Sequence, residues 1–262
     1  MKNKNNKKIN SFLETDGLIK NFGELRALDN VSIQVDRKEI VLLIGPNGSG
    51  KSTLINVITG FLPPDEGKVF FEKEDVTGKD PSELYKRGMV RTFQTPQPLP
   101  EMTVLENIMI GITSKGEEPL TALFYKKWLK QEEEILEKAL DIINFLKLSH
   151  LTFKKAGELS GGQMKLVALG RALMTNPKLI VLDEPIAGVA PGLSHEIFSK
   201  ILELREQDVT FLIVEHRLDI VLKYIDRLYI MFNGKVIAEG KGEKEIKEVL
   251  NDPKIIEIYI GD

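Results

Sequence analysis

The feature that most constrains the fold of this chain is a glycine-rich segment between an apolar run and a helical pattern. Residues 40–44 have the composition of a buried strand, and residues 52–59 have the pattern of a helix. The segment between them matches G-x-x-x-x-G-K-[ST], whose main-chain N–H groups surround a phosphate. A tight structural turn, the alternative, requires neither Lys51 nor Ser52. The residues expected to contact a nucleoside triphosphate are Gly45, Pro46, Asn47, Gly48, Ser49, Gly50, Lys51, Ser52 and Thr53.

A second apolar run ends in two carboxylates. Residues 179–182 read as a central strand, and Asp183 and Glu184 follow it directly, at the edge of a parallel sheet where ligands bind. Lys51 would reach the β- and γ-phosphates, while the Ser52 hydroxyl and Asp183 suit a magnesium ion. Glu184 would orient or deprotonate an attacking water. The alternative is an acid pair that only caps a helix.

The order of the remaining patterns predicts an α/β fold, a P-loop NTPase core built on a mainly parallel sheet. Apolar strands at 178–182 and 209–214 alternate with helical patterns, which favours right-handed crossovers. Short alternating segments over 15–35 and a strand at 68–71 predict an antiparallel β subdomain. Asn233-Gly234 predicts a hairpin near the end of the chain.

The middle third of the chain differs from both flanks because its patterns are helical, at 102–109 and 132–148. It reads as a helical subdomain inserted into the α/β core. After a charged helix at 243–250 we expect only a short tail. The parts expected of this single domain are a disordered tail at 1–12, a nucleotide-binding core formed by 13–94 and 176–262, and a helical subdomain at 95–175.

Composition limits what else the chain can do. Its formal net charge of −3 gives no global reason to expect a nucleic-acid partner. Without cysteine it has no disulfide and no thiolate metal site, which suits a reducing cytoplasm. No apolar segment approaches the roughly 18 residues that cross a bilayer, so any membrane role should depend on a partner.

A third motif, Leu159-Ser160-Gly161-Gly162-Gln163, precedes a helix. Serine and two glycines at a helix N-terminus form another anion site, which one bound nucleotide does not need. In their order and spacing, the three motifs resemble those of the ATP-binding cassette ATPases. That resemblance implies two domains facing head to tail, with each ATP between one chain's phosphate loop and the other chain's Ser160, Gly161, Gly162 and Gln163.

The resemblance covers nearly the whole chain and implies roles for three further residues. Phe22 matches the aromatic residue that stacks on adenine, although it could also be an ordinary strand aromatic. Gln94 matches the glutamine that touches magnesium and the attacking water and that senses the membrane partner. His216 matches the histidine that contacts the γ-phosphate. Ala190 departs from the family, which often has aspartate there, and this weakens the case for a polar contact across the dimer.

Within the family, the chain is most similar to the larger ATPase subunit of branched-chain amino acid importers, including archaeal examples. The similarity rests on residues 91–96, 102–107, a long insertion at 112–131 and the ending at 253–261. It implies that the protein uses ATP and Mg²⁺ as cofactors. It also implies that the protein lies on the inner face of the cell membrane. The partners that it implies are membrane-spanning permease subunits, a second ATPase subunit of the same or another kind and, indirectly, a substrate-binding protein.

Other functions stay open at this point. Similar ATPases serve urea uptake or lipopolysaccharide export, and soluble cassette ATPases act in iron–sulfur assembly, translation or DNA repair. The chain lacks the long coiled coil typical of repair and the paired cassettes and basic surface typical of translation. Aromatic and lysine residues at 124–128 could stack on nucleic acid, but an anchor for the insertion explains them as well. We therefore expect no nucleic-acid partner.

Overall fold

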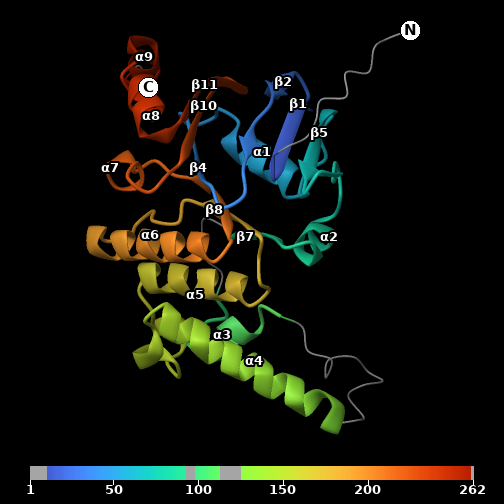
Figure 1. The fold of residues 1–262 in the computed structure, drawn as a ribbon, viewed down its shortest axis with the longest axis vertical. Coiled ribbons are helices and arrows are strands. Elements are labelled where there is room, and N and C mark those ends of the chain that lie inside the picture. The colour runs from blue at the N-terminus through green and yellow to red at the C-terminus, as the bar shows by residue number, and fades with distance from the viewer. Residues whose placement is uncertain (1–10, 93–97, 113–124, 261–262) are drawn as a thin grey trace.

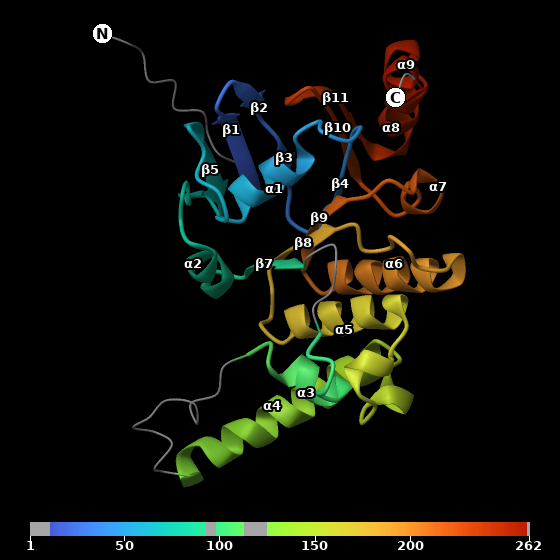
Figure 2. The ribbon, with the colours of Figure 1, turned by 180° about the vertical axis from the view of Figure 1, so that it is seen from behind.

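The computed structural model describes residues 11–92, 98–112 and 125–260. Residues 1–10 of the expected disordered tail, Gln94 and most of the insertion at 112–131 therefore lie outside the described residues, as do the side chains of 125–128. Ser11 and Phe12, the last two residues of that expected tail, are described and are buried. Two sheets occupy one end of the molecule and helices the other, as the views from front and back both show (Figures 1 and 2).

The larger sheet carries the glycine-rich segment at the end of one of its inner strands. Its order is β11 (Lys235–Lys241), β10 (Arg227–Phe232), β4 (Ile40–Ile44), β9 (Thr210–Val214), β8 (Leu179–Asp183) and β7 (Met89–Thr92). All neighbours are parallel except β10 and β11, which form the hairpin predicted at Asn233-Gly234. The prediction of a mainly parallel sheet is confirmed.

A smaller antiparallel sheet lies beside it, as expected from the alternating segments near the N-terminus. Its strands are β1 (Leu13–Phe22), β2 (Leu25–Val31), β3 (Gln34–Val35), β5 (Glu66–Phe71) and β6 (Glu74–Asp75). The strand β1 pairs with β2, β3 and β5. This arrangement brings Phe22, the last residue of β1, toward the nucleotide edge of the larger sheet.

The strand β4 separates two hydrophobic clusters. Successive side chains of a strand point to opposite faces, so Ile40, Leu42 and Ile44 join one cluster, while Val41 and Leu43 join the other. All five are essentially inaccessible to solvent. A strand covered on both faces reads as a continuous apolar run, which is why its sequence predicted it so clearly.

Helices cover both sheets and build the lower half of the molecule in Figure 1. The helices are α1 (Lys51–Ile58), α2 (Pro81–Lys86), α3 (Val104–Met109), α4 (Tyr125–Phe145), α5 (Gly161–Leu173), α6 (Pro191–Glu206), α7 (Leu218–Val221), α8 (Gly242–Leu250) and α9 (Pro253–Ile260), with 3₁₀ turns at Ser149–Leu151 and Ala156–Glu158. Contacts link α5 to α3, α4 and α6, so it joins the helical layer to the core.

The helix α9 replaces the short tail that we expected at the C-terminus, so that expectation was wrong. Asp252 precedes Pro253, and its Oδ1 accepts a hydrogen bond from the N–H of Lys254 at 2.9 Å. Proline at the first helical position is favoured because its missing N–H has no partner there anyway. Ile255 of α9 is buried against the core.

Candidate nucleotide-binding site

The predicted nucleotide residues meet at the carboxyl edge of three neighbouring parallel strands. Val214 at the end of β9 lies opposite Leu43 of β4 and Asp183 of β8, so the segments that follow these strands converge. A cavity of about 480 Å³ opens there. Of the predicted residues, those lining it are Phe22, Asn47, Gly48, Ser49, Gly50, Lys51, Ser52, Thr53, Asp183, Glu184 and His216.

The glycine-rich loop packs too closely on its neighbours for side chains at two of its glycines. A Cβ atom on Gly45 would lie 2.2 Å from the carbonyl oxygen of Met231, and one on Gly50 would lie 2.5 Å from that of Ala27. Gly50 also has a φ of 102°, which L side chains rarely adopt. Only glycine therefore lets the loop close over the end of β4 and lead into α1.

Lys51 folds back over this loop. Its Nζ donates hydrogen bonds to the carbonyl oxygens of Gly45 and Pro46, at 2.7 and 2.8 Å. Burial lowers the pKa of Lys51, and attraction from Glu184 and Asp183 opposes this effect. Main-chain oxygens thus hold the ammonium group at the loop. The charged oxygens of a phosphate would bind it more strongly than these carbonyl oxygens do.

Asp183 is paired with a residue that the sequence analysis did not single out. The Nη2 atom of Arg91, from β7, donates to Oδ2 of Asp183 at 3.0 Å, and both side chains are largely buried. Nη1 of Arg91 donates to Oδ1 of Asn56 on α1 at 2.5 Å. Arg91 thereby links the strand that carries Asp183 to the helix that follows the glycine-rich loop.

Glu184 and His216 approach each other across the cavity. The Nε2 atom of His216 lies 3.5 Å from Oε1 of Glu184. Glu184 has a φ of 49°, in the left-handed region, and its N–H donates to the carbonyl oxygen of Val214 at 2.9 Å. The structure therefore places the proposed water-activating carboxylate beside the proposed γ-phosphate contact.

Glu215, next to His216, is a second residue that sequence reasoning missed. It is 1% exposed, and its Oε1 accepts from the N–H of Ile186 at 2.8 Å. Its Oε2 accepts from the N–H of His216 at 2.9 Å. Glu215 thus fixes the segment after Glu184 relative to His216. Its position directly after a predicted strand is the sequence signal that could have identified it as a site residue.

The Ser160–Gln163 segment does not line this cavity. Ser160 caps α5, because its Oγ accepts from the N–H of Gln163 at 3.3 Å and its own N–H donates to Oε1 of Gln163 at 3.0 Å. A Cβ atom on Gly161 would meet nothing within 4 Å, whereas one on Gly162 would lie 2.3 Å from Cδ2 of Leu193. The segment is an exposed helix N-terminus that does not line its own chain's cavity.

The donor groups at the cavity fit a magnesium triphosphate. Ser52 and Asp183 both line it and offer hard oxygen ligands, the kind that magnesium prefers. Among the described residues, no group of three or more His, Cys, Asp or Glu could hold a metal. When bound, such an ion would neutralise charge that develops on the phosphates.

Comparison with known proteins identifies the family. Residues 28–187 match the family model described as ABC transporter. The chain belongs to the ABC transporter family. A probable branched-chain amino acid transport ATP-binding protein of Methanocaldococcus jannaschii is 68% identical over 250 residues, which cover 95% of this chain and 97% of that protein. A protein of the same description from Archaeoglobus fulgidus is 54% identical over 252 residues, 95% of each chain.

Solved structures agree with this assignment. An ABC transporter cassette in its ADP conformation is 68% identical, with a TM-score of 0.86 over 96% of this chain and 99% of that one. A dimeric cassette in a post-hydrolysis state, bound to ADP and Pi, is 28% identical, with a TM-score of 0.72 over 87% and 98% of the two chains. This ABC chain is therefore an ATPase with the cassette fold.

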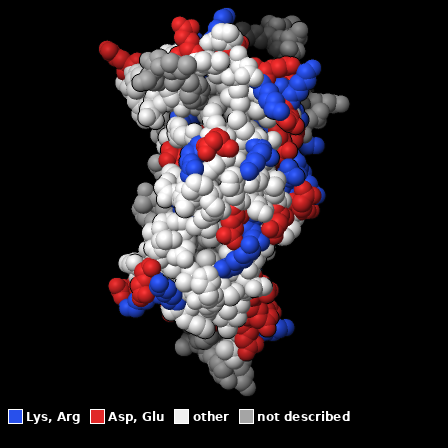
Figure 3. Space-filling view, turned by 90° about the vertical axis from the view of Figure 1, so that its left-hand side faces the viewer, with Lys and Arg blue, Asp and Glu red and all other residues white. Residues whose placement is uncertain are grey.

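Within the described part of the ABC chain, no helix combines the length and apolar content required to cross a membrane. On the face shown in Figure 3, basic and acidic side chains are interspersed rather than gathered by sign.

Proposed function

We propose that this chain is the ATP-hydrolysing subunit of an importer for branched-chain amino acids. The observation that carries the proposal is the 68% identity to the archaeal transport ATP-binding protein over 95% of the chain. Because the matched residues cover 95% of this chain, the similarity includes the helical region as well as the nucleotide site. The subunit would lie on the inner face of the cell membrane, bound to its permease.

ATP would occupy the cavity at the end of β4, with adenine on Phe22 and the phosphates in the loop from Gly45 to Thr53. Lys51 would release its two carbonyl partners and turn to the phosphates. Ser52, Asp183 and Gln94 are the proposed magnesium-site residues. Glu184 would orient or deprotonate the attacking water, and His216 would contact the γ-phosphate.

A second molecule would complete the site. Ser160–Gln163 does not line its own chain's cavity, so it would contact the ATP of a facing subunit through its exposed helix N-terminus. ATP would then favour the closed pair and hydrolysis the open one. The facing subunit would be either a second copy or a different ABC ATPase.

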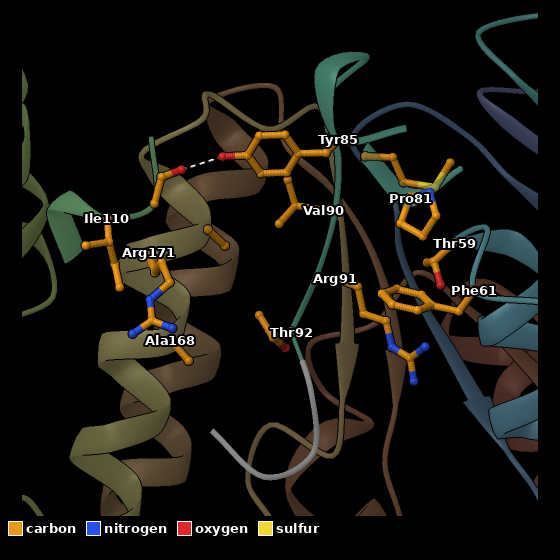
Figure 4. Close-up of a pocket in the computed structure, with 13 residues that line it drawn as sticks. Thr59, Phe61, Pro81, Tyr85, Val90, Arg91, Thr92, Ile110, Ala168 and Arg171 are labelled. Atoms are coloured by element: carbon orange, nitrogen blue, oxygen red, sulfur yellow. Dashed lines mark hydrogen bonds between the residues drawn. The ribbon is translucent and has the colours of Figure 1, made fainter. Parts of the chain in front are cut away.

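The permease would dock in a cavity of about 410 Å³ between the core and the helical layer (Figure 4). Phe61 and Tyr85 stand on the core side and Ile110 on the helical side, and all three are partly exposed. The hydroxyl of Tyr85 donates to the carbonyl oxygen of Gly111 and ties the two walls together. An apolar groove of this kind suits a short amphipathic helix on a membrane subunit.

Affinity purification of the tagged chain from native membranes in mild detergent tests the proposal. We expect two multi-spanning subunits, an ABC ATPase partner and an amino-acid-binding protein to copurify. Recovery from the soluble fraction with iron–sulfur assembly or repair factors would refute the transporter. Copurification of a binding protein for urea would refute branched-chain amino acids as the substrate but would leave the importer function in place.

A further inference from the structure

Lys165 lies on α5 and reaches back to the nucleotide edge of the sheet. Its Nζ donates a hydrogen bond to the main-chain carbonyl oxygen of Glu184. The side chain is half-buried and borders a small cavity together with Asp183. Burial lowers the pKa of Lys165, while attraction from Glu215, Glu184 and Asp183 opposes this effect. Lys165 is therefore a cation placed among the carboxylates of the site, although it does not line the nucleotide cavity.

The backbone of Glu184 needs support, because its φ of 49° is unfavourable for a residue with a side chain. Its main chain forms hydrogen bonds within its own loop and with two other elements. Within the loop, its carbonyl oxygen accepts from the N–H of Ala187 at 3.3 Å. On one side, its N–H donates to the carbonyl oxygen of Val214 at the end of β9. On the other side, its carbonyl oxygen accepts the bond from Lys165 on α5. Beyond its own loop, Glu184 is thus restrained by β9 of the core and by α5 of the helical layer.

We propose that Lys165 is a positioning residue that holds Glu184 in the orientation required for ATP hydrolysis. The helix that carries Lys165 begins with Ser160–Gln163, which would contact the ATP of the facing subunit. A shift of α5 caused by that nucleotide would reach Glu184 of the same chain through this hydrogen bond. The proposal rests on the role that we assign to Glu184 in hydrolysis.

Steady-state ATP hydrolysis by the full-length Lys165→Met variant tests this proposal. Methionine keeps an unbranched apolar side chain but cannot donate the hydrogen bond. We expect kcat to fall about tenfold to a hundredfold, since small misplacements of a reacting group have effects of this size. The KM for ATP should change less than about threefold, because ground-state binding is not affected. Lys165→Arg, which keeps a charged donor, should have a kcat closer to wild type than to Lys165→Met.

Lys138→Met is the matched control. Lys138 lies on α4, and its Nζ donates to the carbonyl oxygen of Met174 at 2.7 Å and to Oδ1 of Asn176 at 2.8 Å. The Lys138→Met variant loses these two hydrogen bonds, which lie away from the nucleotide cavity, so its kcat should stay near wild type. If Lys165→Met loses no more kcat than this control, the positioning role is refuted. Wild-type turnover by Glu184→Gln, measured in parallel, would instead refute the role of Glu184 on which the proposal depends.

Discussion

The Nη2 atom of Arg91 lies 3.0 Å from Oδ2 of Asp183, although the two residues are 92 positions apart in the sequence. The same guanidinium group lies 5.6 Å from the centre of the Phe61 ring and borders the proposed permease cavity (Figure 4). The proposed magnesium carboxylate is therefore neutralised by a residue that also forms a wall of the proposed docking site. Arg91 connects the two sites physically.

We expect Arg91→Met to lower the free energy of unfolding of the nucleotide-free chain by about 2–3 kcal/mol, because it removes charge-assisted bonds from largely buried partners. Urea unfolding measures this change. The control is Arg37→Met, which breaks an ion pair with Glu72 whose arginine is 64% exposed. That loss should stay below about 1 kcal/mol. If both variants lose the same free energy of unfolding, the buried bonds of Arg91 do not stabilise the fold more than an exposed ion pair does.

Lys51→Ala should weaken ATP binding at least tenfold, which corresponds to about 1.4 kcal/mol. The reason is that the lysine ammonium is the cation held at the glycine-rich loop, where phosphates would bind. Isothermal titration with ATP measures the Kd. Lys20→Ala is the control, since Lys20 is also largely buried but pairs with Asp65 away from the cavity. A wild-type Kd for Lys51→Ala would exclude this loop as the phosphate site.

Ser160→Ala should reduce ATP-dependent dimerisation by more than the loss of a helix cap alone would explain. The substitution removes the capping box of α5, a loss of about 1 kcal/mol. Thr103→Ala removes the equivalent capping box of α3 and is the matched control. Size-exclusion chromatography with ATP, in a Glu184→Gln background, should show fewer dimers for Ser160→Ala than for Thr103→Ala. Equal dimer fractions would argue that Ser160 caps its helix and does nothing more.

Asp75 should contribute to the pH dependence of stability. Hydrogen bonds from Lys68 and Thr77 lower its pKa to about 2. Because the folded-state pKa is depressed, the contribution is present above about pH 4 and is lost as the pH falls toward 2. Both side chains of the Lys68–Asp75 pair are exposed, so screening limits it to less than about 1 kcal/mol. Urea unfolding of Asp75→Asn should show a shallower decline than wild type over this pH range, and an unchanged decline would contradict the assignment.

Local patterns predicted much of the core from the sequence. The strand at 40–44 matches to the residue, and the Asn233-Gly234 hairpin formed as expected. These features succeed because a buried run, a turn type or a glycine position is determined by neighbouring residues.

The sequence analysis missed two helices that both begin with the same pair of residues, an aspartate followed by a proline. Asp80-Pro81 begins α2 and Asp252-Pro253 begins α9, and in each case the aspartate accepts a hydrogen bond from a main-chain N–H of the first turn. The signal was present, but the two helices have only 6 and 8 residues, which is too short for a clear helical pattern of apolar residues. The proposed subdomain boundaries at 94–95 and 175–176 stay a prediction.

The partners of the site residues were not predictable, because they come from distant segments. Arg91 meets Asp183 and Lys165 meets Glu184 only once the sheet and α5 are assembled. A sequence pattern can indicate that a carboxylate follows a strand, but it does not state which cation will face it.

The most direct test of the account is uptake of labelled leucine by proteoliposomes that contain the purified complex with its binding protein. With ATP on the side of the ATPase, wild type should accumulate leucine, and unlabelled isoleucine and valine should compete. Glu184→Gln should bind ATP but accumulate no leucine above the nucleotide-free level. Normal ATP hydrolysis with no uptake of any branched-chain amino acid would contradict the importer function and leave an ABC ATPase that serves another substrate.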